Sequence, residues 1–235
     1  MTHPVKSSWT TIAGSAGSFD AYLALPPAGS GPGLLLYQEI FGVNEHIRTV
    51  AEQYALDGFV VLAPDVFWQQ QRRLDIGYTP DDIQRGRAMA MATDRAALQR
   101  DMVDALRTLR ERPEVGQRRV GTFGYCMGGR LAYVAAATAG VDAAVAYYGG
   151  GIQDQLELAP RISCPIMFHY GALDANIPLT AVDKVRAAVQ GKAAEVHVYD
   201  NADHGFNCWA RGSYHAGSAA LAHARSLQFF AQRLF

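Results

Sequence analysis

A cysteine between small residues is the strongest chemical signal in this 235-residue chain. Cys126 lies in the segment Gly124-Tyr125-Cys126-Met127-Gly128, after β-prone residues and before an alanine-rich helical pattern. A strand, a tight turn and a helix in this order are typical of a nucleophile elbow, which exposes the nucleophile on a strained turn. The two glycines keep strand and helix from colliding, and the first helix amides can stabilise an oxyanion. Alone, the pentapeptide is also compatible with a buried structural cysteine.

A catalytic thiol needs a base and an acid that orients the base, and both follow in the chain. Asp174 comes just after a predicted strand at 165–170, and His204 comes just after another at 195–199. The steps of 48 residues (126 to 174) and 30 residues (174 to 204) each leave room for a strand–helix repeat. We call Cys126, Asp174 and His204 the predicted triad, and we expect them to meet at the carboxyl edge of a sheet.

Other residues compete for these roles. Asp200 and Asp203 are alternative acids, although an orienting acid usually comes from a separate loop that faces the imidazole. Asp174 alone is a weak signal, because loop aspartates commonly form turns or cap helices. Six further histidines lie inside predicted strands, in the last helical region or away from strand ends. They are His3, His46, His169, His197, His215 and His223.

The composition is that of a globular protein, with 49% hydrophobic and 18% charged residues and a net charge of −1. We expect no nucleic-acid or membrane partner, because no basic run and no apolar span is present. The N-terminal segment 1–6 lacks an apolar signal core. Three cysteines, Cys126, Cys164 and Cys208, do not form a disulfide framework, which favours the cytoplasm. Without CxxC or HExxH spacing, we expect neither a metal nor another cofactor.

The secondary-structure pattern predicts one α/β domain over residues 1–235. An N-terminal hairpin precedes buried strands that alternate with helices, which predicts a mostly parallel sheet covered on both faces. Functional residues of such folds gather in loops at the carboxyl ends of the strands. The expected strands are 8–13, 19–25, 34–37, 59–63, 118–123, 141–148, 165–170 and 195–199. The expected helices are 45–57 with Asn44 as N-cap, 78–112 with a break near 93–94, 127–138, 179–189 and 216–234.

Four segments carry a family resemblance, and Ala63-Pro64-Asp65 agrees with it. They are Gln38-Glu39-Ile40-Phe41-Gly42, Gly124-Tyr125-Cys126-Met127-Gly128-Gly129, Gly171-Ala172-Leu173-Asp174 and Asp203-His204-Gly205-Phe206. Together they resemble the dienelactone hydrolase family of carboxymethylenebutenolidase-like enzymes over nearly the whole chain. The resemblance implies an α/β-hydrolase fold, in which helices flank a mostly parallel central sheet on both faces, and it implies no cofactor.

The resemblance also implies roles for individual residues. The predicted triad would supply the nucleophile, the orienting acid and the base. Glu39 would contact the resting thiol until substrate displaces it, and a nearby carboxylate disfavours the oxidisable thiolate in the meantime. The backbone amides of Ile40 and Met127 would form the oxyanion hole.

Substrate binding is where the chain departs from the family's pattern. The best-known members hold an anionic substrate with two arginines, and Arg85 or Arg87 matches the first of them. The second position, four residues after the histidine, holds Cys208, and Arg211 is a candidate substitute because guanidinium suits carboxylate geometry. The aromatic candidates for lining the cleft are Phe41, Trp68, Tyr125, Phe206 and Trp209.

The sequence therefore predicts a cytoplasmic hydrolase of small, anionic esters or lactones that works through a thioester on Cys126. We expect a monomer or a small homo-oligomer. Two alternatives stay open. The first is an oxidisable thiol sensor, which would not need Asp174 or His204. The second is acyl transfer or carbon–carbon hydrolysis by the same triad.

Overall fold

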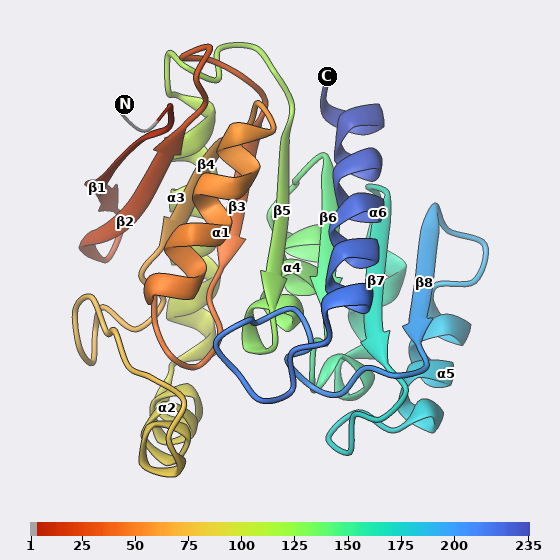
Figure 1. Ribbon diagram of the computed structural model, residues 1–235. Helices are drawn as coiled ribbons and strands as arrows, with labels where there is room; N and C mark the ends of the chain where they lie inside the picture. Colours follow the sequence, from red (N-terminus) through yellow and green to blue (C-terminus); the bar gives the residue numbers. More distant parts are fainter. Residues whose placement is uncertain (1–3) are drawn as a thin grey trace.

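A computed structural model describes residues 4–235 of the chain, so the first three residues of the N-terminal segment discussed above lie outside the description. Eight strands form one sheet. They are β1 (Lys6–Gly14), β2 (Gly17–Leu25), β3 (Gly33–Tyr37), β4 (Val60–Pro64), β5 (Val120–Tyr125), β6 (Ala143–Tyr147), β7 (Ile166–Gly171) and β8 (Ala194–Tyr199). Their order across the sheet is β1-β2-β4-β3-β5-β6-β7-β8 (Figure 1).

The sheet is mostly parallel, as predicted. Only the pairs β1–β2 and β2–β4 are antiparallel, and the pairs from β4–β3 through β7–β8 are parallel. Each residue of β3, β4, β5, β6 and β7 is buried. These strands are continuous apolar runs because helices cover both of their faces.

The helices lie on both faces of the sheet (Figure 1). They are α1 (Glu45–Leu56), α2 (Pro80–Ala92), α3 (Arg95–Arg110), α4 (Met127–Thr138), α5 (Leu179–Ala188) and α6 (Ala216–Leu234), and two short 3-10 helices at Ile152–Asp154 and Leu156–Arg161 were not predicted. Helices α1 and α6 cover one face, α3, α4 and α5 cover the other, and α2 lies beyond the carboxyl ends of the strands. Within residues 4–235, no helix combines the length and the apolar character needed to cross a membrane.

Side-chain caps fix where the first helices begin. Asn44 accepts a hydrogen bond from the Ile47 amide at 3.2 Å and starts α1, as predicted. Thr79 forms a capping box with Asp82 and starts α2. The Asp94 carboxylate accepts from the Ala96 amide at 2.8 Å and starts α3, which confirms the predicted break near 93–94.

A buried polar network joins β6, β7 and β8 to α6. The two ring nitrogens of His169 bond to the Tyr199 hydroxyl and the Ser226 hydroxyl, each at 2.9 Å, and Ser226 also bonds to Tyr147 at 2.7 Å. Burial lowers the pKa of His169 well below its ordinary value, so the ring is neutral. This histidine serves packing, as its place inside a strand predicted.

Candidate active site

The strand β5 and the helix α4 meet at Cys126 in a sharp turn. Cys126 has φ 55° and ψ −115°, a conformation that residues with a side chain rarely adopt. Two backbone bonds hold the turn: the Cys126 amide donates to the Tyr147 carbonyl at 3.0 Å, and the Arg130 amide donates to the Cys126 carbonyl at 3.2 Å. The surrounding fold therefore imposes a strained backbone that directs the thiol away from the sheet.

The glycines on either side of Cys126 allow a close backbone approach. A Cβ atom on Gly124 would overlap the Gly128 carbonyl, and a Cβ atom on Gly128 would overlap the Tyr37 carbonyl. Both obstacles are backbone atoms, which cannot rotate away as a flexible side chain can. The predicted reason for these glycines is confirmed.

Replacing Gly128 with alanine is expected to lower the free energy of unfolding by about 2 kcal/mol or more, because the added methyl group must displace backbone. Urea unfolding followed by circular dichroism measures the effect. Gly212→Ala is the matched control, since nothing lies within 4 Å of its Cβ position, and a change below about 0.5 kcal/mol is expected there. Equal unfolding midpoints for the two variants would contradict the steric explanation.

The predicted triad comes together at the carboxyl edge of the sheet. Nδ1 of His204, in the loop after β8, lies 2.7 Å from Oδ2 of Asp174, in the loop after β7. Asp174 is 2% exposed, and the other oxygen of its side chain accepts from the Asn176 amide at 2.8 Å. The His204 imidazole also interacts electrostatically with Cys126, the third member of the predicted triad. Asp203, a rival acid, instead accepts from the His204 backbone amide at 2.6 Å.

Burial and nearby charges shift the pKa values of His204 and of two thiols. Burial lowers the pKa of His204, but the charge of Cys126 and the hydrogen bond to Asp174 outweigh it and raise that pKa to about 10. This environment favours the protonated imidazolium form of His204. Burial raises the pKa of Cys164 and of Cys208 to about 11, so both remain protonated thiols near neutral pH.

Glu39 lies in the loop after β3 and is 1% exposed. One of its oxygens accepts from Nη1 of Arg211 at 3.3 Å, and the other has no hydrogen-bond partner among residues 4–235. Burial raises the pKa of Glu39, while the charges of Arg211 and His204 act in the opposite direction. Glu39 thus bonds to Arg211 here, and contact between Glu39 and the thiol stays a prediction.

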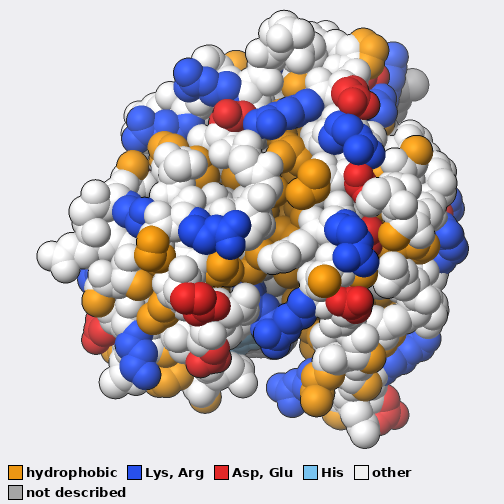
Figure 2. Space-filling model, turned by 180° about the vertical axis from the view of Figure 1, so that it is seen from behind, with side chains coloured by type: hydrophobic (Ala, Val, Ile, Leu, Met, Phe, Trp, Pro, Cys, Tyr) orange, Lys and Arg blue, Asp and Glu red, His pale blue; other side chains and the backbone are white. Residues whose placement is uncertain are grey.

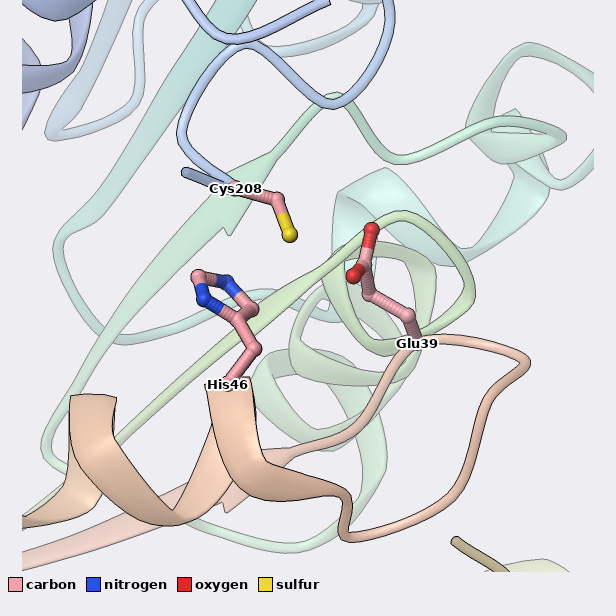
Figure 3. Close-up of side chains that lie close together, drawn as sticks. All are labelled: Glu39, His46 and Cys208. Atoms are coloured by element: carbon pink, nitrogen blue, oxygen red, sulfur yellow. The ribbon is translucent and has the colours of Figure 1, made fainter. Parts of the chain in front are cut away.

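Three buried side chains beside Arg211 have the types of metal ligands. Potential ligand atoms of Glu39, His46 and Cys208 lie within 4.8 Å of one another, and Figure 3 shows them grouped around one space. Burial, and then the charge of Arg211, lowers the pKa of His46 to about 4. A further cation there would be repelled by this guanidinium, which already pairs with Glu39. We therefore assign no metal to the cluster.

A cleft of about 560 Å³ opens beside Cys126 between α2, α3 and α4. Ile40 and Met127, whose amides are the predicted oxyanion donors, line it next to the thiol. Among the predicted substrate-binding residues, only Arg87 lines this cleft. It is joined by Arg95 and Arg130, which were not predicted.

The other predicted substrate-binding residues lie elsewhere. Arg85 hydrogen-bonds to Gln71, and Arg211 lies 5.7 Å from the ring centre of Phe41. Phe41 and Tyr125 do not line the cleft because both are buried, at 2% and 1% exposure. Trp209 is 45% exposed, and its ring packs edge-on against His46 at 4.3 Å.

One signal for the unpredicted residues was present in the sequence. Arg130 comes four residues after Cys126 and therefore lies in the first turn of α4, close to the nucleophile in the chain. Arg95 and His46 had no comparable local signal, because each reaches the site only through the packing of its helix.

The dienelactone hydrolase family model matches the chain over residues 19–234. The chain belongs to the dienelactone hydrolase family. It is 33% identical over 217 residues to the carboxymethylenebutenolidase of Pseudomonas putida, covering 91% of each chain. A candidate carboxymethylenebutenolidase from Synechocystis is 32% identical over the full length of both chains.

A solved structure agrees with this family membership. The crystal structure of a candidate dienelactone hydrolase from Klebsiella pneumoniae is similar at a TM-score of 0.87 and 30% identity, over 97% of this chain and 99% of that one. The predicted α/β-hydrolase fold is confirmed by the family and by the eight-stranded sheet. The predicted enzyme class is confirmed too: the protein is a carboxylic ester hydrolase of the carboxymethylenebutenolidase type.

Proposed function

We propose that the enzyme hydrolyses small esters or lactones through a thioester on Cys126, with His204 as the proton carrier and Asp174 as its orienting acid. The observation that carries the proposal is the imidazole of His204, whose Nδ1 lies 2.7 Å from the buried Asp174 carboxylate and whose pKa is raised by the charge of Cys126. A buried carboxylate on Nδ1 holds the ring in one orientation and stabilises its positive charge.

In the proposed reaction the Cys126 thiolate attacks the carbonyl carbon, a carbon–sulfur bond forms, and the carbonyl electron pair moves onto oxygen. The amides of Ile40 and Met127 receive this oxyanion. Met127 is the first residue of α4, where amides lack acceptors within the helix. The His204 imidazolium protonates the leaving oxygen as the carbon–oxygen bond breaks. The neutral ring then takes a proton from water, which attacks the thioester and releases the thiolate.

Glu39 has a proposed part between turnovers. Its partnerless oxygen is buried, and burial raises its pKa, which increases the share of the neutral carboxyl form. A neutral carboxyl group can donate a hydrogen bond to sulfur, whereas a carboxylate disfavours the thiolate. In either form, contact with Glu39 would make the resting thiol less reactive. We propose that Arg211 and substrate determine how much of the time Glu39 spends near the thiol.

Covalent trapping tests the proposal. The enzyme is mixed with para-nitrophenyl acetate, quenched in acid during the first turnover, digested and analysed by mass spectrometry. We expect an acetyl group on the peptide that contains Cys126. Cys164 and Cys208 serve as internal controls, because their thiols have pKa values raised to about 11. Turnover with the acetyl group on another residue, or with no covalent adduct, would overturn the thioester mechanism.

The pH profile of kcat/KM should report the state of His204. The pKa of this imidazole is raised from its ordinary 6.5 to about 10, so the proton needed by the leaving group is present below that pH and is lost above it. We expect kcat/KM for a neutral ester to fall with a midpoint near pH 10. Asp174→Asn should move this midpoint downward, because the carboxylate helps to hold the proton. Asp203→Asn is the control and should leave it in place.

A further inference from the structure

His46 is a buried histidine that the proposed mechanism does not use. It is the second residue of α1 and is 2% exposed. Its ring packs edge-on against Trp209, with 4.3 Å between the ring centres, and against Tyr125 at 6.0 Å. Within residues 4–235, neither ring nitrogen of His46 has a hydrogen-bond partner. Buried polar atoms are normally paired, so two unpaired nitrogens on one buried ring need an explanation.

The ring of His46 is neutral and can act in two ways. Burial, and then the charge of Arg211, lowers its pKa to about 4. A neutral imidazole has one N–H donor and one acceptor nitrogen, and its tautomer determines which nitrogen has which role. It can therefore donate to a carboxylate or accept from a neutral carboxyl group. The same ring suits Glu39 in either protonation state.

Glu39 lacks a second hydrogen bond. Its one side-chain contact is the 3.3 Å bond from Nη1 of Arg211, which is longer than the usual charge-assisted bond of about 2.7–2.9 Å. Its other oxygen is buried and has no partner in the described part of the chain. An unpaired oxygen in such a place is costly in free energy. Arg211 alone therefore holds Glu39 only loosely.

His46, Glu39 and Cys208 face one space (Figure 3). No hydrogen bond within the described chain joins the three side chains directly, although their ligand atoms lie within 4.8 Å of one another. An atom placed equally far from all three would lie at most about 2.8 Å from each, which is hydrogen-bonding distance. A water molecule that bridges buried polar groups needs a few partners of this kind. Water is neutral, so the guanidinium of Arg211, which repels a cation here, does not exclude it.

This cluster is separate from the cleft beside Cys126. Figure 2 shows a furrow on the face that carries α3 and α4, with hydrophobic side chains inside it. Cys126 lines the cleft, whereas Glu39, His46 and Cys208 are not among its lining residues in the described chain. A substitution at His46 therefore changes the surroundings of Glu39 without removing a contact from the substrate cleft.

We propose that His46 is a positioning residue for Glu39. Through one water molecule it binds the second carboxyl oxygen of Glu39 and keeps this side chain beside Arg211, away from the Cys126 thiol. Glu39 then has to lose two contacts before it can reach the sulfur. The inference deepens the proposed part of Glu39 and rests on it, because Glu39 is proposed to make the thiol less reactive when the two meet. His46 thereby sets the fraction of enzyme molecules whose thiol is free to react.

Alkylation of Cys126 by iodoacetamide, followed by mass spectrometry of its peptide, measures this fraction. Loss of one hydrogen bond shifts the ratio of the two Glu39 positions about tenfold. His46→Phe keeps a flat ring without nitrogens, and we expect it to slow alkylation about two- to fivefold. His46→Leu, which is smaller, should have the same effect. His46→Gln offers a donor and an acceptor and should restore at least about half of the wild-type rate.

The Glu39→Ala background shows whether His46 acts through Glu39. Without the carboxyl group His46 has nothing to position, so adding His46→Phe should change the alkylation rate less than about 1.5-fold there. His197→Phe is the matched control, since His197 lies on β8 and pairs with Glu195. It should be alkylated at the wild-type rate. Wild-type rates in both His46→Phe and His46→Leu, or equal slowing in the Glu39→Ala background, would overturn the inference.

Crystal structures of the wild-type enzyme and of His46→Phe separate the inference from the chemistry. We expect a water molecule between His46 and Glu39 in the wild-type enzyme, and Glu39 turned toward Cys126 in the variant. Glu39 beside Arg211 in both structures would overturn the inference, even if acyl trapping on Cys126 succeeds. A displaced Glu39 together with slower alkylation supports it, even if acyl trapping fails.

Discussion

Cys126→Ala is expected to lower kcat/KM for para-nitrophenyl acetate at least about 10³-fold, because the proposed covalent intermediate forms on its sulfur. The oxyanion donors and the substrate cleft remain in the variant, so some rate above the background is expected to persist. Initial rates at high enzyme concentration, corrected for spontaneous hydrolysis, measure the loss.

Cys164→Ala is the control for thiol loss. Cys164 is partly buried outside the cleft lining, and its pKa is raised to about 11. We expect kcat/KM within about twofold of the wild-type value, as for other substitutions remote from an active site. If Cys126→Ala retained a tenth of the wild-type activity, the sulfur could not be the nucleophile.

Asp174→Asn has the second largest expected effect, a loss in kcat/KM of about 10²–10⁴-fold. The carboxylate is buried and lies 2.7 Å from Nδ1 of His204, so its charge stabilises the imidazolium directly. An amide of the same shape cannot supply this charge, and its NH₂ group can hold the ring in the wrong tautomer. The same ester assay measures the loss.

Asp203→Asn tests whether the effect belongs to Asp174 specifically. Asp203 is the neighbour of His204 in the chain, but it accepts only from the backbone amide. Asp203→Asn should keep kcat/KM within about threefold of the wild-type value, because the His204 imidazole keeps its hydrogen bond to Asp174. Melting temperatures of both variants show whether a lost activity reflects a lost fold. Similar losses of activity in two folded variants would contradict the assignment of Asp174 as the orienting acid.

The sheet was predictable because local rules determine it, and the same rules place Asp174 and His204 at one edge of it. The glycines around Cys126 mark a turn in which backbone segments pack closely. Asp174 follows a strand that is a buried apolar run, whereas His204 follows an edge strand that is only partly buried. Parallel strands end at one edge, so residues far apart in sequence meet there without any further information. Strand ends differed from prediction by one or two residues, since terminal pairing depends on neighbouring strands.

The substrate side of the site was not predictable in the same way. Arg95 lies at the start of a helix and carries no motif, and it reaches the cleft because α3 packs beside α4. Arg211 was predicted to bind substrate, and here its guanidinium bonds to Glu39, a contact that no sequence pattern indicated. These contacts depend on the relative placement of whole helices and loops, which periodicity and capping do not specify.

The backbone at Cys126 also limits how this enzyme can change. A side chain at φ 55° costs about 1–3 kcal/mol relative to a relaxed conformation, and glycine would remove most of that cost. Stability and catalysis therefore favour different residues at position 126. Glycine would relieve the backbone strain, whereas the proposed mechanism needs the sulfur of cysteine. The strain at Cys126 is a stability cost that accompanies the proposed nucleophile.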